Sequence, residues 1–114
     1  MKLAAIFMIL ATGAFADAPV VEGVKAKVAT SGEWRFDVTV SHPDTGWDHY
    51  ADGWVVEDGN VLGLRELAHP HETEQPFTRS LGGVVIPEGT QRVWVRTRCI
   101  VDGWSEQVFE VALE

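Results

Sequence analysis

Hydrophobic and polar residues alternate with a period of two along much of the chain. The clearest case is the segment 34–40, in which Trp34, Phe36, Val38 and Val40 alternate with polar residues. Because successive side chains of a β-strand point to opposite faces, this pattern predicts a strand with one apolar face. Further segments of strand-like composition cover residues 24–28, 54–57, 61–67, 77–86, 92–101 and 107–113.

Turn-forming residues separate these segments, and no window has the apolar spacing of an amphipathic helix. The turns are predicted at Ser31-Gly32, Asp58-Gly59-Asn60, Pro87-Glu88-Gly89 and Asp102-Gly103. About seven short strands in about a hundred residues are typical of an immunoglobulin-like antiparallel β-sandwich. We therefore predict an all-β chain with this architecture. The alternative is an OB-like barrel, which normally also has a helix and a basic face.

The N-terminal segment has the pattern of a signal peptide. Lys2 precedes an apolar run over residues 3–12, and Ala14-Phe15-Ala16 has the small-x-small pattern after which signal peptidases cut. We predict a signal peptide over residues 1–16 and a single β-sandwich domain over residues 17–114. The apolar run is shorter than the roughly 20 residues that span a bilayer. We therefore expect a periplasmic or secreted protein without a membrane anchor.

The composition indicates a globular domain that folds without disulfides. The 114 residues are 46% hydrophobic and 23% charged, and they include a single cysteine, which cannot form an internal disulfide. The formal net charge is -8, and no basic stripe offsets it. Because this charge repels a phosphate backbone, we expect no nucleic-acid partner. We expect a monomer, with another periplasmic protein as the possible partner.

All four histidines fall in two segments that connect predicted strands. His42 and His49 lie between the second and third strands, and His69 and His71 lie between the fourth and fifth. Alternate links of an antiparallel sandwich emerge at the same end, so all four histidines are expected at one end. Cys99 lies near the end of the sixth predicted strand and approaches the same end.

This clustering suggests a transition-metal site, because imidazole nitrogens and thiolates bind copper, zinc and iron in proteins. Copper is preferred to zinc, since imidazole-rich sites favour Cu(II) in the affinity order. The alternative is that the histidines cap turns or contact carboxylates in two polar loops, and that Cys99 is a buried, unreactive thiol. The candidate metal ligands are His42, His49, His69, His71 and Cys99, with Asp48 or Glu72 as further donors.

No motif in the sequence names a reaction. The chain lacks a Gly-x-Ser-x-Gly elbow, a phosphate-binding loop, a Cys-x-x-Cys pair and a His-Glu-x-x-His motif. Trp94, Arg96 and Arg98 form an outward stripe that we expect to pair with acids such as Glu106 or Glu110 across strands. The pattern favours a binding or accessory module over an enzyme, and a metal-free protein-interaction domain remains a third possibility.

Two phrases of the sequence resemble a family of small exported proteobacterial proteins. They are residues 45–52, TGWDHYAD, and residues 69–80, HPHETEQPFTRS. This resemblance implies export and a sandwich fold, and it implies no mechanism.

A second resemblance is to the iron domain of superoxide reductase. His42-Pro43 and His49-Tyr50, with Cys99 on a late strand, are similar to the His-Pro, His-Tyr and Cys positions of that family. The resemblance implies an immunoglobulin-like sandwich in which His42, His49 and an axial Cys99 thiolate bind iron and superoxide is reduced. The spacing between the two histidines is one residue longer here, Asp102 stands where the family has a histidine, and no histidine precedes His42.

Overall fold

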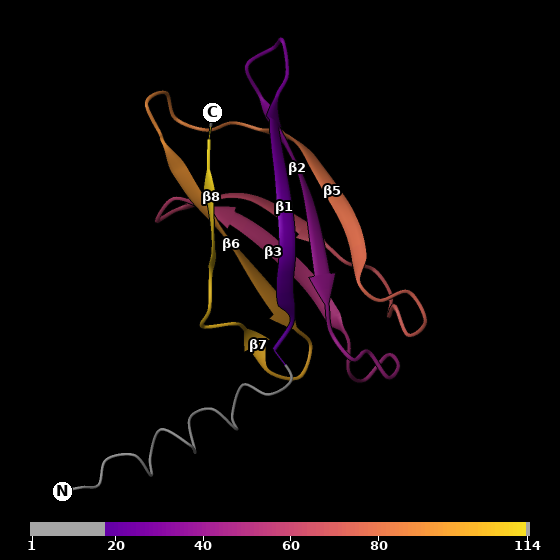
Figure 1. Cartoon of the computed structure of the whole chain (residues 1–114). Helices are drawn as coiled ribbons and strands as arrows, with labels where there is room; N and C mark the ends of the chain where they lie inside the picture. Colours follow the sequence, from indigo (N-terminus) through magenta and orange to yellow (C-terminus); the bar gives the residue numbers. More distant parts are fainter. Residues whose placement is uncertain (1–17, 114) are drawn as a thin grey trace, which may run out of the picture.

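Eight strands form two antiparallel sheets in the part of the chain that the computed structural model describes, residues 18–113 (Figure 1). The described residues contain no helix that is long and apolar enough to cross a membrane. The predicted signal peptide, residues 1–16, lies outside the described residues. The strands are β1 (Val20–Val28), β2 (Trp34–Ser41), β3 (Ala51–Glu57), β4 (Val61–Glu66), β5 (Phe77–Val84), β6 (Arg92–Cys99), β7 (Gly103–Trp104) and β8 (Phe109–Ala112).

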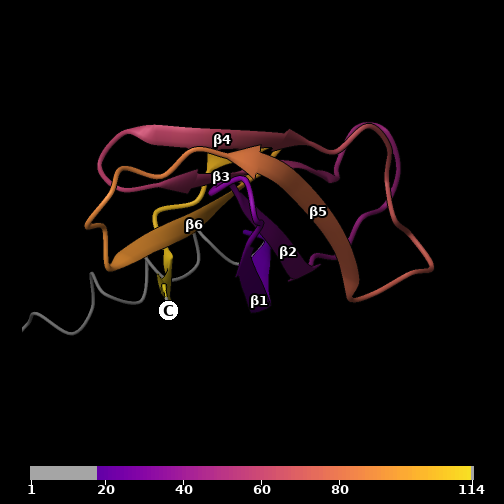
Figure 2. The ribbon, with the colours of Figure 1, turned by 90° about the horizontal axis from the view of Figure 1, so that it is seen from above.

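The two sheets confirm the predicted all-β sandwich. The first has the strand order β1-β2-β5, and the second has the order β4-β3-β6-β7, with β8 also paired to β6. Figure 2 shows β3 and β4 at one side of the molecule and β1 and β2 at the other. Each of the seven predicted segments overlaps one strand, although β1 and β3 begin earlier than predicted. The sequence analysis missed β7, because two residues paired with the end of β6 are too few to show a periodicity.

The core lies between the sheets and consists of the apolar faces that the alternation predicted. Phe36, Val38 and Val40 of β2 are buried, whereas Trp34 at the start of that strand is partly buried. They pack in one apolar cluster with side chains from the opposite sheet, notably Trp54 of β3 and Val93 and Val95 of β6. Burial of a large apolar side chain stabilises the fold by about 1.5 to 3 kcal/mol.

The links that carry the candidate ligands emerge at one end of the sandwich, the lower end in Figure 1, which we call the loop end. It consists of residues 42–50 after β2, 67–76 after β4 and 100–108 after β6. Backbone hydrogen bonds hold the links in place: the Ile100 N–H donates to the Tyr50 carbonyl of a neighbouring link at 3.0 Å, and the Leu67 N–H donates to the Asp52 carbonyl of β3 at 3.0 Å. The alternation of strand direction therefore places all four histidines at one end, as predicted.

Candidate metal centre

Three of the five predicted ligands come together at the loop end. One ligand atom from each of His42, His49 and Cys99 lies within 4.8 Å of the other two. Cys99 is the last residue of β6 and is fully buried, with 0% exposure, and His42 is 3% exposed. The two imidazole rings meet at an interplanar angle of 90° with centroids 5.0 Å apart. Metal bonds of about 2.0 to 2.3 Å keep ligand atoms within about 4.6 Å of each other, so this spacing approaches that of a single ion.

The two histidines present nitrogens that the protein leaves unpaired. Nε2 of His42 and Nε2 of His49 are both buried, and neither has a hydrogen-bond partner. A buried polar atom without a partner costs about 1 to 3 kcal/mol, so such atoms are rare without a reason. A metal ion would supply the missing partner. The residues therefore fit a transition metal by the chemistry of their donors.

A buried carboxylate holds His42 in the form that a metal requires. Asp44 Oδ1 lies 2.5 Å from His42 Nδ1 and also accepts a hydrogen bond from the Ala51 N–H at 3.1 Å. Because a carboxylate accepts hydrogen bonds, Nδ1 carries the proton and the lone pair of Nε2 is free. A carboxylate behind a metal-binding imidazole is a common arrangement that fixes the ring orientation and raises its basicity. The sequence analysis missed Asp44, although its position two residues after His42 was a usable signal.

A short backbone turn fixes His49. A β-bridge joins Gly46 and His49, with the His49 N–H donating to the Gly46 carbonyl at 3.1 Å. The Thr45 N–H donates to the His49 carbonyl at 3.0 Å. This turn folds the β2–β3 link back on itself, so that His49 returns to the neighbourhood of His42 despite the seven-residue separation in sequence.

His71 makes a different set of contacts. Its ring stacks on Phe77, with centroids 3.9 Å apart and an interplanar angle of 9°, and its Nε2 accepts a hydrogen bond from Arg79 Nη2 at 2.9 Å. Its Nδ1 lies 3.9 Å from Asp44 Oδ2, too far for a hydrogen bond. Desolvation by burial lowers the pKa of His71, and the charges of Arg79 and His69 lower it further. The ring is therefore neutral at pH 7, with Nε2 already engaged by an arginine.

His69 is exposed at the surface, beside His71. Their ring centroids are 4.6 Å apart, and Nδ1 of His69 lies 3.1 Å from the Pro70 carbonyl oxygen. Within residues 18–113, the group of side chains spaced for a metal contains neither of these two histidines, nor the exposed Asp48 and Glu72. The predicted burial of Cys99 is confirmed, and the thiol nevertheless lies next to two histidines.

Gln75 and Asp44 join the two histidine-bearing links. The Gln75 side chain accepts a hydrogen bond from the His42 N–H at 2.9 Å and donates one to the His71 carbonyl at 2.8 Å. Asp44 Oδ2 accepts a hydrogen bond from the His71 N–H at 2.7 Å. The link containing His69 and His71 thus supports the His42 loop through its backbone. No sequence signal pointed to Gln75.

The outward stripe of Trp94, Arg96 and Arg98 lies on the opposite face of β6 from the core. Arg96 donates to Glu57 Oε2 at 2.8 Å, and Arg98 donates to Asp52 Oδ1 at 2.9 Å. The expected pairing of the arginines with acids across strands is therefore confirmed. The acids are Glu57 and Asp52 of β3, however, and not Glu106 or Glu110.

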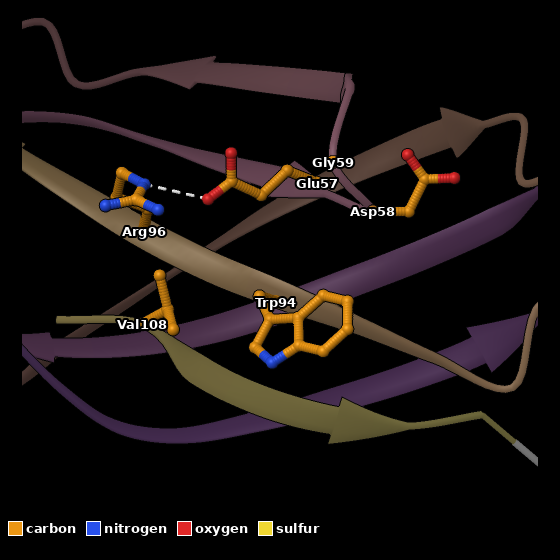
Figure 3. Close-up of a pocket in the computed structure, with 6 residues that line it drawn as sticks. All are labelled: Glu57, Asp58, Gly59, Trp94, Arg96 and Val108. Atoms are coloured by element: carbon orange, nitrogen blue, oxygen red, sulfur yellow. Dashed lines mark hydrogen bonds and ion pairs between the residues drawn. The ribbon is translucent and has the colours of Figure 1, made fainter. Parts of the chain in front are cut away.

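Glu110 pairs instead with Arg92 at 3.0 Å. A hollow of about 500 Å³ lies beside the Glu57–Arg96 pair (Figure 3). Its lining includes Trp94, five residues before Cys99, or about 16 Å along the strand. This hollow is therefore separate from the histidine cluster.

Comparisons with known proteins support the fold. No protein-family model matches the chain. A protein from Halomicrobium mukohataei named "Putative lipoprotein" is 47% identical over 82 residues, which are 70% of this chain and 40% of that protein. The chain thus spans less than half the length of that relative.

Two solved structures share the architecture. One is a hypothetical protein from Pyrococcus horikoshii OT3, with a TM-score of 0.53, 17% identity, and coverage of 85% of this chain and 88% of that chain. The other is the superoxide reductase (neelaredoxin) from Ignicoccus hospitalis, with a TM-score of 0.51, 16% identity, and coverage of 100% of both chains. The resemblance to superoxide reductase is therefore confirmed for the fold. The resemblance of residues 45–52 and 69–80 to exported proteobacterial proteins stays a prediction.

Proposed function

We propose that this chain is an exported β-sandwich module that binds one transition-metal ion through His42, His49 and Cys99. The observation that carries the proposal is the pair of buried imidazole Nε2 atoms without hydrogen-bond partners, in two histidines that each have a ring nitrogen within 4.8 Å of the buried Cys99 thiol. Asp44 orients His42 from behind, and Gln75 holds the loop in place. His69 and His71 act outside the coordination sphere.

Copper is the metal that we propose for this site. Two imidazoles and one thiolate form the ligand set of copper electron-transfer proteins, and copper leads the affinity order of the divalent first-row metals. When bound in such a set, copper supplies one-electron redox chemistry. Zinc also accepts three protein ligands and one open position, so it is the principal competitor.

The charge of the loop end supports the capture of a cation. Its three links contain five exposed carboxylates and neither lysine nor arginine. A surface region of one sign concentrates ions of the opposite sign. The exposed acids are Asp48, Glu72, Glu74, Asp102 and Glu106.

A second candidate is an iron site that reduces superoxide. The fold similarity to the superoxide reductase of Ignicoccus hospitalis favours it, together with the matching positions of His42, His49 and Cys99. Two observations rank it second: the acidic loop end repels an anionic substrate, and the described cluster offers three ligands where that family has five.

Export is supported by the signal-peptide pattern of residues 1–16 and by the name of the Halomicrobium relative, since lipoproteins belong to the cell envelope. We propose a periplasmic or secreted location and a monomeric protein without a nucleic-acid partner.

The test is the metal content of the full chain, exported to a bacterial periplasm and purified without an affinity tag. The protein is titrated with Cu(II), Zn(II) and Fe(II), and bound metal is measured by mass spectrometry against a competing chelator. We expect one copper ion per chain, held in His69→Ala and lost in His49→Ala. His69→Ala is the matched control, because it removes an exposed histidine from the same end.

Absorption spectra identify the ligands and the metal. A thiolate–copper or thiolate–iron(III) site gives an intense visible band that disappears in Cys99→Ala, whereas zinc gives none. Circular dichroism establishes that each variant remains folded. Equal copper binding by His49→Ala and the unaltered chain contradicts the proposal, and a preference for iron with superoxide turnover replaces it by the second candidate.

A further inference from the structure

Apolar side chains are exposed at the loop end beside the proposed metal centre. Trp47 is 67% exposed, Ile100 is 46% exposed and Val101 is 60% exposed. The Trp47 ring packs edge-on against Tyr50, with centroids 5.8 Å apart, and the Ile100 N–H donates to the Tyr50 carbonyl. We call these four residues, Trp47, Tyr50, Ile100 and Val101, the loop-end patch. They come from two different links that the fold brings side by side.

The loop-end patch is joined directly to two of the proposed ligands. His49 precedes Tyr50, and Cys99 precedes Ile100. Tyr50 and Ile100 are therefore each covalently bonded to a proposed ligand residue. A partner that contacts these two patch residues lies one residue along the chain from His49 and from Cys99. No other exposed apolar group in residues 18–113 is adjacent in sequence to two of the ligands.

Two acidic residues are neighbours in sequence of the patch residues Trp47 and Val101. Asp48 and Asp102 are both exposed, and neither forms an ion pair within the described part of the chain. The nearest arginines in sequence are already paired, Arg96 with Glu57 and Arg98 with Asp52. The rim of the patch is therefore electronegative.

We propose that the loop-end patch is the docking surface for a basic one-electron carrier protein. Specific interfaces combine an apolar centre with a polar rim, and complementary charge on the two rims accelerates and orients docking. The patch supplies the centre, and Asp48 and Asp102 supply a rim that fits lysines or arginines. In the redox step, the reduced partner would give one electron to Cu(II) held by His42, His49 and Cys99, so that the partner is oxidised and the copper becomes Cu(I), and no bond is made or broken. The electron transfer depends on the proposed function, whereas the docking does not.

The experiment uses cytochrome c as a cationic redox probe and succinylated cytochrome c, whose lysines are converted to carboxylates, as the anionic control. Affinity is measured by titration of the full exported chain, without metal and with copper, at low and physiological ionic strength. Two charge variants are compared: Asp48→Asn with Asp102→Asn at the patch, and Asp58→Asn with Glu88→Gln in turns at the opposite end. Both remove two negative charges from acids that form no ion pair in residues 18–113.

We expect the patch double variant to weaken binding about fivefold and the control double variant to weaken it less than twofold. Trp47→Ser, which removes an exposed side chain, weakens binding by about tenfold. In the protein loaded with Cu(II), the rate of electron transfer from reduced cytochrome c to the copper falls in the same order. Metal content is measured for every variant, so that a lost ion is not mistaken for lost docking.

The proposal is overturned if the two double variants weaken cytochrome c binding equally, or if Trp47→Ser has no effect on it. Binding would then depend on the net charge of the protein alone. Equal binding of the succinylated probe also overturns the proposal. If the chain holds no metal but the patch still binds the cationic probe specifically, docking stands and the proposed function fails. If copper is held and no patch variant alters binding, the proposed function stands and the docking surface is refuted.

Discussion

The buried carboxylate of Asp44 is predicted to determine both the stability of the loop end and the affinity for metal. Its oxygens receive the Ala51 N–H, the His71 N–H and His42 Nδ1, and its side chain is fully buried. Asp44→Ala leaves all three donors without this acceptor. A buried unpaired donor costs about 1 to 3 kcal/mol, and local rearrangement recovers part of that, so we expect a loss of about 3 to 5 kcal/mol in the free energy of unfolding.

Asp44→Asn is the sharper variant, because its amide keeps the shape of the side chain and one acceptor oxygen. The amide nitrogen cannot accept a hydrogen bond, so at least one of the three donors loses its partner, at about 1 to 2 kcal/mol. His42 is then no longer held by a carboxylate, and we expect metal affinity to fall about 10- to 100-fold.

Urea unfolding followed by tryptophan fluorescence measures the stability, and competition with a chelator measures the affinity. Asp58→Asn serves as the control, since its exposed turn carboxylate accepts one hydrogen bond from the Asn60 N–H at 3.1 Å, and it is expected to change stability by less than about 0.5 kcal/mol. If Asp44→Asn retains both stability and affinity, then the carboxylate does not orient His42 and the reasoning is refuted.

Three further predictions concern the fold and its pH dependence. Phe36→Ala empties a fully buried core position and is expected to cost about 3 to 5 kcal/mol of unfolding free energy in urea titrations. Gly63→Ala places a Cβ 2.8 Å from Leu81 Cδ2, so calorimetry is expected to show a loss of about 1 to 2 kcal/mol from overpacking, and an unchanged midpoint contradicts this. His71 has a lowered pKa when folded, so the unfolded chain takes up its proton first. Stability is therefore fully present above about pH 6.5 and declines as pH falls below it. In His71→Gln, the stability lost between pH 7 and pH 5 is expected to be smaller, and an identical pH profile refutes the assignment.

Local sequence pattern was sufficient for the strands and for the burial of single positions. The alternation in residues 34–40 places all the apolar residues on one side only if the segment is a β-strand, and that side then faces the core. Cys99 shares the parity of Val93 and Val95 along β6, and all three are fully buried. The same logic fails for β7, because a two-residue strand has no period.

The sequence pattern alone is enough to predict a sandwich with every histidine at one end, because strand parity sets the side on which each link emerges. It did not determine which histidines meet Cys99, since that depends on the path of each link in space. The β-bridge between Gly46 and His49 returns His49 toward His42, whereas Phe77 and Arg79 engage His71. Which residues form the site is seen only in the folded chain. Distances of a few ångströms between side chains from separate loops arise from packing and hydrogen bonds, and no local sequence pattern encodes them.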